Sequence, residues 1–369
     1  MSETKNADKL RTYLRSAKDE LNSAATVHCV VGNEAADLDS MASAVLYAYY
    51  RNETRRSENE LYVPVISIPR EDFKLRTEAV YLFTEAGLDQ KLLIFAEDID
   101  LKALYTTGRL ALTLVDHNKP TGAYTEYQDA VRGVLDHHAD EKMFTDAEVR
   151  VIEPVGSAAT LVAEQILAEK TELLDDGAIT LLLGTVLLDT VNLDPGAERV
   201  TPKDEEVAKR LLERSNLKQQ ELFDAVQREK FNVSALSSAD LLRKDYKEWK
   251  LGGYQVGISS VLLSISDWLA KDAALSQSLA RYAESHKLDL LLAMNAYTAP
   301  EFTRELVVYC PDEALRKQVL EFLKESNLGL SSIESNQVDD ATALFAQGNL
   351  GMSRKKLQPV LAEFFEKLS

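Results

Sequence analysis

Short apolar runs alternate with amphipathic stretches through the first half of the chain. Residues 27–31 form a β-rich apolar run, and residues 40–51 have the apolar spacing of a helix. Further short apolar runs lie at residues 61–68, 92–95, 110–115, 133–135 and 149–152. Short runs separated by helical stretches are typical of parallel strands joined by helices. The pattern predicts an α/β fold with an N-terminal, doubly wound, mainly parallel sheet, whose ligand crevice lies at the carboxyl ends of the strands.

The pattern changes after residue 157. Two long helical runs, 157–170 and 175–191, precede a polar, charged helical stretch over 202–230. Beyond residue 237 a second alternation begins, with predicted strands at 254–260, 288–295 and 305–309 and predicted helices at 264–286, 315–326 and from Arg354 onward. We therefore expect a first domain over residues 1–200, a helical linker over 201–235, and a smaller C-terminal α/β domain over 236–369.

Composition narrows the class of protein. The 369 residues are 45% hydrophobic, which suffices for packed cores and excludes wholesale disorder. The formal net charge of −18 opposes binding to nucleic acid and to anionic membrane surfaces. The two cysteines, Cys29 and Cys310, lie far apart in apolar runs, which argues against a disulfide framework. Without a run of about 20 apolar residues or an apolar leader, we expect a cytoplasmic protein with no membrane or nucleic-acid partner.

Acidic and histidine side chains follow the predicted strands of the first half. Residues 32–40 (GNEAADLDS) follow the run 27–31, residues 114–118 (LVDHN) end the run 110–115, and residues 134–138 (VLDHH) end the next run. A fourth cluster, around Asp189, interrupts an apolar helical stretch. Because parallel strands present their carboxyl ends at one edge of a sheet, these clusters are expected to converge.

The converging side chains suit a pair of divalent cations. Asp37 and Asp39 can aim their carboxylates at neighbouring ions, and Asp116, from a different strand, can bridge them. His137 offers an imidazole nitrogen, and Asp189 adds a carboxylate from a helix. Such a set could hold ions roughly 3.5–4 Å apart for phosphoryl transfer. Oxygen-rich ligands with one or two imidazoles favour Mg²⁺ or Mn²⁺ over structural zinc.

Each cluster also has a purely structural interpretation. Aspartate is a favoured helix N-cap, so Asp37 could serve only as a cap. A His-His pair such as His137 and His138 is also common at protein surfaces. Asp189 differs, because burying a carboxylate in an apolar helix is costly unless it is paired or bound to a metal.

Together the four clusters resemble the motifs of the DHH phosphoesterase superfamily, and Asp136-His137-His138 is similar to its signature. The resemblance covers residues 27 to about 361 and is strongest to the branch with a DHHA2 domain, in particular the fungal cytosolic exopolyphosphatase and prune subfamily. Supporting segments are residues 156–160 (GSAAT), 353–356 (SRKK) and 304–307 (RELV). It implies that residues 1–200 are the DHH metal-binding catalytic domain, residues 236–369 the DHHA2 substrate-binding domain, and that the active site lies in the cleft between them.

The resemblance also assigns roles. It implies two Mg²⁺ or Mn²⁺ ions held by Asp37, Asp39, Asp116, His137 and Asp189, with Asp116 as the bridge. His138 would face the substrate phosphate, and we group His138, Asp116 and Asn33 as the catalytic residues. Asn33 departs from family II inorganic pyrophosphatases, which carry a histidine ligand there, so we expect a preference shifted from Mn²⁺ toward Mg²⁺.

Basic side chains of the second half complete the predicted site. The resemblance places Arg354 and Lys355 on the terminal phosphate and Lys247 in the same pocket. Arg304 is a further substrate-binding candidate, and Arg70 and Arg76 are possible anchors for an extended substrate. His117 is open between an ion ligand and a residue that orients Asp116. Arginine and lysine at the start of a helix are otherwise usually solvated.

The resemblance implies an exopolyphosphatase that uses a two-metal activated water to release orthophosphate from the end of inorganic polyphosphate. An inorganic pyrophosphatase and a prune-like phosphodiesterase or nucleoside-polyphosphate hydrolase are the alternatives within enzymes. A non-catalytic regulatory scaffold would show an eroded metal set, but all the ligand positions are filled here. The glycine pairs do not make a DHHA1 motif, which disfavours RNA substrates. The resemblance also favours a monomer.

Overall fold

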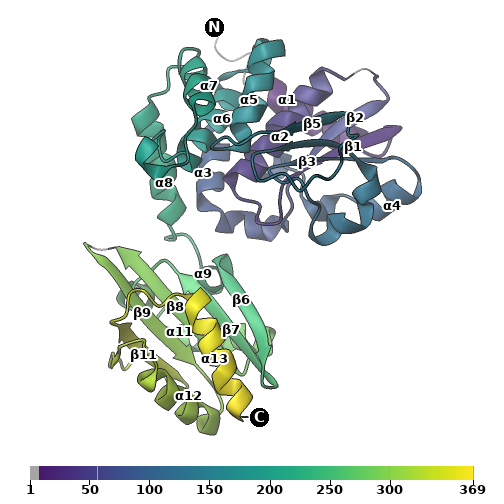
Figure 1. Ribbon diagram of the computed structural model, residues 1–369. Helices are drawn as coiled ribbons and strands as arrows, with labels where there is room; N and C mark the ends of the chain where they lie inside the picture. The colour runs from purple at the N-terminus through teal and green to yellow at the C-terminus, as the bar shows by residue number, and fades with distance from the viewer. Residues whose placement is uncertain (1–7, 56, 299, 369) are drawn as a thin grey trace. The chain divides into compact units, whose positions relative to one another are not determined.

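The chain folds into two compact units. The computed structural model describes residues 8–55, 57–298 and 300–368. The boundary between the units falls between Phe231 and Asn232, and each unit has its own sheet and its own hydrophobic core. The two α/β patterns in the sequence therefore correspond to two separately packed bodies (Figure 1).

The first unit is built on a five-stranded, wholly parallel sheet in the order β2-β1-β3-β4-β5 (Figure 1). Its strands are β1 (Thr26–Val31), β2 (Glu60–Val65), β3 (Leu110–Val115), β4 (Val131–Asp136) and β5 (Val149–Ile152). Because β2 and β3 lie on opposite sides of β1, the carboxyl ends of β1 and β3 flank the point at which the strand order reverses. This is where doubly wound sheets bind ligands. The predicted parallel sheet is confirmed.

Helices surround this sheet. They are α1 (Asp8–Glu20), α2 (Leu38–Glu53), α3 (Thr77–Glu85), α4 (Leu101–Thr106), α5 (Ala158–Glu169), α6 (Asp176–Asp189), α7 (Pro202–Leu212) and α8 (Gln219–Phe231). Short 3-10 turns cover Arg70–Leu75, Gln90–Leu92, Ala96–Asp98, Gly122–Ala130, Thr171–Leu173 and Pro195–Ala197. Helix α2 is buried on almost every side, because it contacts β1, β2 and β3 and also α5 and α6. Its first turn lies directly after the loop that follows β1.

One predicted strand is wrong. Residues 92–95 do not join the sheet as a strand; Gln90–Leu92 is a 3-10 turn, and a single bridge joins Ile66 to Phe95. Leu93, Ile94 and Phe95 are buried, so their apolar character reflects packing in the core rather than a strand.

The charged stretch after residue 201 belongs structurally to the first unit. Helix α7 packs on α5 and α6, and α8 packs on α3 and α6. Val207, Leu211, Leu222 and Val226 are buried in the core of the first unit. The boundary between the units nevertheless falls inside the segment 201–235.

The second unit contains a six-stranded mixed sheet in the order β10-β11-β9-β8-β7-β6. Its strands are β6 (Tyr246–Leu251), β7 (Tyr254–Val261), β8 (Leu290–Thr298), β9 (Phe302–Tyr309), β10 (Leu330–Ser332) and β11 (Thr342–Gln347). Only the β7–β8 pair is parallel among these described strands. Its helices are α9 (Ser238–Lys244), α10 (Ile265–Lys271), α11 (Leu275–Ser285), α12 (Glu313–Glu325) and α13 (Arg354–Leu368). The helix predicted over 264–286 is therefore two helices, separated by residues 272–274.

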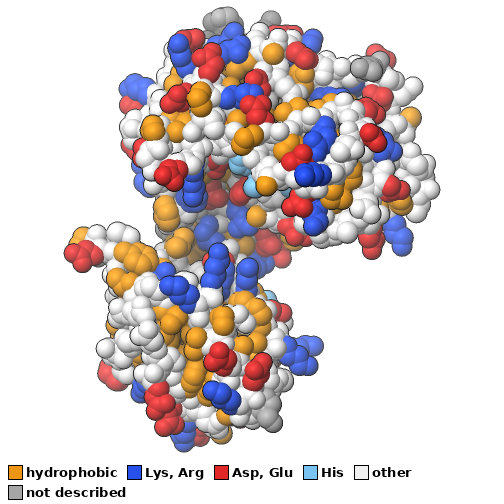
Figure 2. Space-filling model, in the orientation of Figure 1, with side chains coloured by type: hydrophobic (Ala, Val, Ile, Leu, Met, Phe, Trp, Pro, Cys, Tyr) orange, Lys and Arg blue, Asp and Glu red, His pale blue; other side chains and the backbone are white. Residues whose placement is uncertain are grey.

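The surface of each unit carries both signs of charge. Figure 2 shows acidic and basic side chains interspersed with apolar atoms, and histidine in pale blue beside acidic side chains on the first unit. Within the described ranges, no helix is both long enough and apolar enough to cross a lipid bilayer.

Candidate metal centre

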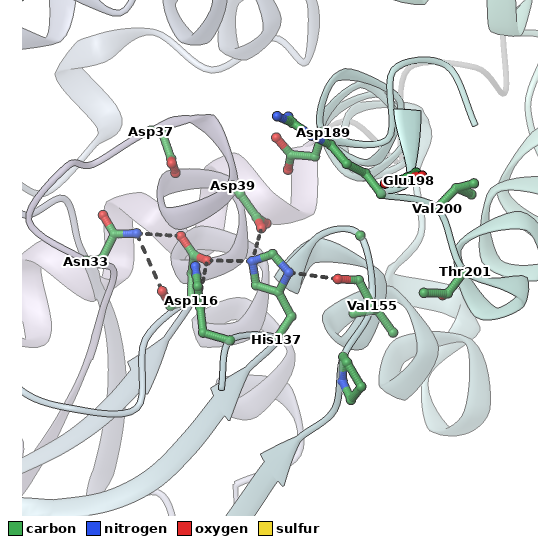
Figure 3. Close-up of a pocket in the computed structure, with 14 residues that line it drawn as sticks. Asn33, Asp37, Asp39, Asp116, His137, Val155, Asp189, Glu198, Val200 and Thr201 are labelled. Atoms are coloured by element: carbon green, nitrogen blue, oxygen red, sulfur yellow. Dashed lines mark hydrogen bonds and ion pairs between the residues drawn. The ribbon is translucent and has the colours of Figure 1, made fainter. Parts of the chain in front are cut away.

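Five predicted ligands, scattered between positions 37 and 189, line one pocket of the first unit. The pocket has a volume of about 500 Å³ and opens at the carboxyl edge of the parallel sheet. Figure 3 shows its acidic side chains and one imidazole pointing toward one another, and the ligands are Asp37, Asp39, Asp116, His137 and Asp189. The convergence expected from the strand ends is therefore present, although their roles as ligands stay a prediction.

Asp37 and Asp39 are held by the start of helix α2. Asp37 is the N-cap of α2, and its Oδ1 accepts a hydrogen bond of 3.1 Å from the Ser40 backbone N–H. The capping interpretation and the ligand interpretation are thus compatible, because the cap contact with Ser40 uses only Oδ1 and the Asp37 side chain lines the pocket. The aspartate at position 37 both starts α2 and faces the site.

Asp39, in the first turn of α2, caps a different helix, α5. Its Oδ2 accepts from the Ala158 N–H at 2.6 Å, and its Oδ1 accepts from the Ala159 N–H at 2.8 Å. Ser157, the residue at the N-cap of α5, makes no side-chain capping bond, so Asp39 takes its place from another part of the chain. The positive end of the α5 dipole stabilises this carboxylate, which is 4% exposed.

Asp116 lies at the centre of the hydrogen-bond network. Its Oδ2 accepts from Ser40 Oγ at 2.6 Å and from Asn33 Nδ2 at 2.7 Å, and its Oδ1 lies 3.1 Å from His137 Nε2. Its backbone φ of 62° falls in the left-handed region, which aspartate tolerates better than most residues but which still stores strain. The turn after β3 is thus bent sharply so that the carboxylate faces the pocket.

His137 is oriented by the backbone. Its Nδ1 donates to the Val155 carbonyl at 2.9 Å, which leaves Nε2 to face Asp116 and, at 3.7 Å, Asp39 Oδ2. Burial lowers the pKa of His137, but the hydrogen bond to Asp116 and the Asp39 charge outweigh it and raise the pKa to about 10. In metal-bound histidines, a hydrogen bond from the ring nitrogen that does not bind the metal fixes the tautomer in the same way.

The carboxylates destabilise one another in the absence of a compensating charge. Burial and the neighbouring Asp116 raise the pKa of Asp39 to about 7. Burial, followed by the charge of Asp39, raises the pKa of Asp189 well above its ordinary value. Asp189 Oδ2 is shielded from solvent and has no hydrogen-bond partner among the described residues. Convergent carboxylates with an unpartnered oxygen and an oriented imidazole fit divalent cations that prefer oxygen ligands.

Asn33 turns its NH2 group, not its oxygen, toward the cluster. Its Oδ1 accepts from the backbone N–H groups of Ala35 at 2.8 Å and Ala36 at 3.2 Å. Two N–H donors require an oxygen at that position, so the amide assignment follows from the network. Asn33 therefore donates to Asp116, and its catalytic role stays a prediction.

Asp136, to which the sequence analysis gave no role, is hydrogen-bonded to both histidines beside the pocket. It is 0% exposed, and its Oδ1 accepts from the His137 backbone N–H and from His138 Nδ1, both at 2.8 Å. His138 itself lines the pocket with its side chain exposed. Atoms of Asp116, Asp136, His137 and His138 lie close enough to hold a metal ion, but Asp136 lies behind the histidines as their anchor. An acidic residue ending an apolar strand is the signal that could have identified it.

His117 does not line the pocket. Its Nδ1 contacts the Val115 carbonyl at 2.9 Å, and its Nε2 is buried without a described partner. Burial lowers the pKa of His117.

Arg70 and Arg76 support the loops of the first unit. Arg76 donates to the carbonyls of Ala35 at 2.6 Å and Ala36 at 3.2 Å, so it braces the loop that carries Asn33 and Asp37. Arg70 pairs with Asp98 and stacks over the Phe95 ring. Their role as anchors of an extended substrate is not supported by these contacts.

The predicted basic side chains of the second unit differ in their surroundings. Arg354 Nη2 lies 2.6 Å from Asp245 Oδ1, and the Arg354 side chain is only 12% exposed. Lys355 and Lys247 are exposed, at the start of α13 and near the start of β6. Because Asp245 directly precedes β6, this pair brings the start of α13 beside Lys247. Arg304 donates to the Leu350 carbonyl at 2.8 Å and lies over the Phe302 ring.

Family models match most of the chain. The model of the DHH family, N-terminal domain, matches residues 28–185, and the DHHA2 domain model matches residues 224–364. Exopolyphosphatase PRUNE1 of Rattus norvegicus is 37% identical over 96% of this chain and 79% of that protein. A protein of Schizosaccharomyces pombe, provisionally named an exopolyphosphatase, is 31% identical over 98% of this chain and 97% of that protein. A manganese-dependent inorganic pyrophosphatase of Methanocaldococcus jannaschii is 24% identical over 76% of this chain and 86% of that protein. The chain therefore belongs to the DHH family, among the members that carry a DHHA2 domain.

Proposed function

We propose that this chain is a divalent-cation-dependent phosphoanhydride hydrolase that removes terminal orthophosphate from inorganic polyphosphate. The observation that carries the proposal is the convergence of four carboxylates and one imidazole in one pocket, with Asp189 Oδ2 unpartnered. The names of the relatives support it, because both the rat and the fission-yeast proteins are named exopolyphosphatases.

The proposed ligands are Asp37, Asp39, Asp116, His137 and Asp189. A pair of Mg²⁺ or Mn²⁺ ions bound by them would supply an activated water and neutralise charge on the phosphates. The residues that the structure places around these ligands keep them in position. Ser40 and Asn33 hold Asp116, Val155 orients His137, and the N-terminus of α5 stabilises the charge of Asp39.

His138 is proposed to contact the substrate. Asp136 anchors its Nδ1 at 2.8 Å, which leaves Nε2 for a phosphate oxygen. An anchored, exposed imidazole can donate a proton to the oxygen of the departing phosphate chain. Lys247, Arg354, Lys355 and Arg304 are proposed to bind the phosphate chain from the second unit. Arginine offers paired donors to phosphate oxygens, and lysine a compact charge.

Inorganic pyrophosphatase is the second candidate. The manganese-dependent pyrophosphatase of M. jannaschii, similar over 76% of this chain, favours it. Asparagine at position 33 disfavours it, because the resemblance places a histidine ligand there in family II pyrophosphatases. A regulatory protein without activity is disfavoured, because all five proposed ligands are present in the pocket.

Phosphate release from polyphosphate, pyrophosphate and adenosine tetraphosphate, each with Mg²⁺ and with Mn²⁺, tests the proposal. We expect release from polyphosphate to dominate and to stop when EDTA removes the cations. Turnover of pyrophosphate alone would show a pyrophosphatase. An absence of turnover on all three substrates, with Mn²⁺ still bound, would support the regulatory alternative. We also propose that the protein is cytoplasmic and monomeric, as expected from the sequence.

A further inference from the structure

We propose that Arg199 of the first unit binds a phosphate group of the substrate; this inference rests on the proposed function. Arg199 belongs to the segment between α6 and α7, which the sequence analysis left without a role. The segment lines the same pocket as the carboxylates. In Figure 3, its residues Glu198, Val200 and Thr201 lie on the Asp189 side of the cluster, away from Asn33. The pocket therefore extends beyond the proposed ligands toward this segment.

The backbone of this segment is held in place by Asp204. The Asp204 side chain is fully buried, and its Oδ2 accepts from the Thr201 N–H at 2.8 Å and from the Gly156 N–H at 2.9 Å. Its Oδ1 accepts from Thr160 Oγ1 at 2.6 Å. One carboxylate thus ties the segment to the start of α5, which also carries the two N–H groups bound by Asp39.

Gly156 allows the backbone of Arg199 to pack closely against the residues before α5. A Cβ atom at this position would lie 2.7 Å from the Arg199 carbonyl oxygen and 2.4 Å from Thr190 Cγ2. Residue 156 must therefore be glycine for the segment to pack against the pocket wall. Glu198 has a left-handed φ of 55°, which turns the chain directly before Arg199. The backbone that carries Arg199 is consequently fixed before any substrate arrives, which lowers the entropic cost of binding.

The guanidinium of Arg199, by contrast, has no partner within residues 8–55, 57–298 and 300–368. Among the described residues that line the pocket, Arg199 is the one lysine or arginine. Its side chain is exposed and forms no hydrogen bond or ion pair with any described residue. Arg70, Arg76 and Arg354 are all engaged, by Asp98, by backbone carbonyls and by Asp245 respectively. Arg199 is therefore free to bind a ligand in the pocket.

Phosphate is the ligand that this setting suits. Each phosphate unit of a polyphosphate carries negative charge, and a planar guanidinium can donate two parallel hydrogen bonds to its oxygens. The carboxylates of the pocket repel such a substrate unless cations compensate them. Divalent ions would neutralise the ligands themselves, and Arg199 is placed to attract the phosphates that lie beyond them. Arg199 is thus a substrate-binding residue rather than a ligand of the ions.

The test compares Arg199→Ala and Arg199→Lys with the matched control Arg214→Ala. Arg214 is an exposed arginine of the same unit that does not line the pocket. Steady-state kinetics on tripolyphosphate and longer polyphosphate give KM and kcat. Calorimetric titration with inorganic phosphate in the presence of Mg²⁺ gives binding without turnover, and titration with Mn²⁺ alone gives metal affinity.

Arg199→Ala should raise KM and weaken phosphate binding by about tenfold or more, with a smaller change in kcat. Arg199→Lys should recover part of the loss, and Arg214→Ala should match wild type. Affinity for Mn²⁺ should stay the same or rise, because a positive charge beside the ligands has been removed.

Wild-type KM and wild-type phosphate affinity in Arg199→Ala would overturn the inference while the proposed function stands. Weaker Mn²⁺ binding in that variant would also overturn it, because it would show a role in building the metal site. Failure of the wild-type chain to hydrolyse polyphosphate would instead reject the proposed function, and the phosphate titration would then still report on Arg199.

Discussion

Asn33 Nδ2 lies 2.7 Å from Asp116 Oδ2 and donates a hydrogen bond to it across the carboxyl ends of β1 and β3. The two residues are 83 positions apart in sequence, and the contact joins the two sides of the point at which the strand order reverses. Because Asn33 uses its oxygen for the backbone of its own loop, the contact has a fixed direction. It orients the carboxylate that is proposed to bridge two ions.

Loss of this contact should weaken the metal site. Asn33→Ala should reduce activity by about tenfold to a hundredfold, since partners that orient a ligand typically contribute that much. Asn33→His replaces a donor by a potential ligand and should raise activity with Mn²⁺ relative to Mg²⁺. Phosphate release as a function of each cation measures both effects. An unchanged cation profile in Asn33→His would show that position 33 does not reach the ions.

Asp116→Ala should abolish activity while the fold remains. The carboxylate is proposed to serve both ions, so its loss should lower phosphate release by several orders of magnitude. Without metal, the melting temperature of Asp116→Ala should fall below that of wild type only by the contribution of the lost hydrogen bonds with Ser40 and Asn33. Circular dichroism melting provides the control. Near-normal turnover would contradict the role of Asp116.

The stability of the metal-free protein should fall as pH rises. Asp39 has a folded-state pKa of about 7 against an unfolded value of about 3.9, so its stabilising protonated form is lost over this interval. The pKa of Asp189 is also raised in the folded state, so its contribution to stability falls with rising pH as well. The pKa of His137 is raised to about 10 in the folded state from about 6.5 in the unfolded state. Its stabilising contribution is therefore lost as the pH rises from about 6.5 to about 10.

Melting temperatures in EDTA should therefore drop between pH 5 and pH 8, and saturating Mn²⁺ should remove the drop at pH 8 by supplying the missing positive charge. Asp189→Asn should flatten the pH dependence in EDTA, because it removes one of the carboxyl groups that must ionise. A melting temperature in EDTA that rises from pH 5 to pH 8 would contradict the electrostatic account.

The ion pair of Arg354 with Asp245 should orient the guanidinium for phosphate. Asp245→Ala removes the carboxylate that holds Arg354 Nη2 and leaves the bond from Arg354 Nη1 to the Asp245 backbone carbonyl. The substitution should raise KM for polyphosphate by several-fold up to about tenfold, with kcat changed less. Asp245→Asn keeps an acceptor oxygen and should recover part of the loss. Lowered KM in Asp245→Ala would mean that Asp245 competes with the substrate for Arg354 instead of orienting it.

Much of the first unit was predictable from its sequence because buried parallel strands are short, continuous apolar runs. Residues 110–115 and 149–152 were predicted with the bounds of β3 and β5. The run at 92–95 failed because burial alone makes a segment apolar, whatever its backbone conformation. Strand β6 was missed because three of its six residues, Lys247, Glu248 and Lys250, are charged and break the apolar run, as suits an edge of the second sheet.

The site was predictable only in part. Acidic residues at strand ends indicated which side chains converge, because sheet topology brings those ends together. Contacts between distant segments left no local signal. The capping of α5 by Asp39 is one example, and the tie between Asp204 and Gly156 is another. Nor does the sequence reveal which end of the Asn33 amide faces Asp116, since that depends on the loop around Ala35.

Calorimetric titration of the wild-type chain and of Asp116→Ala with Mn²⁺ tests the central claim most directly. The account predicts that wild type binds two ions per chain near neutral pH and that Asp116→Ala loses most of this binding while staying folded. Wild-type protein that binds no Mn²⁺, or an Asp116→Ala variant that binds two ions as tightly as wild type, would contradict it.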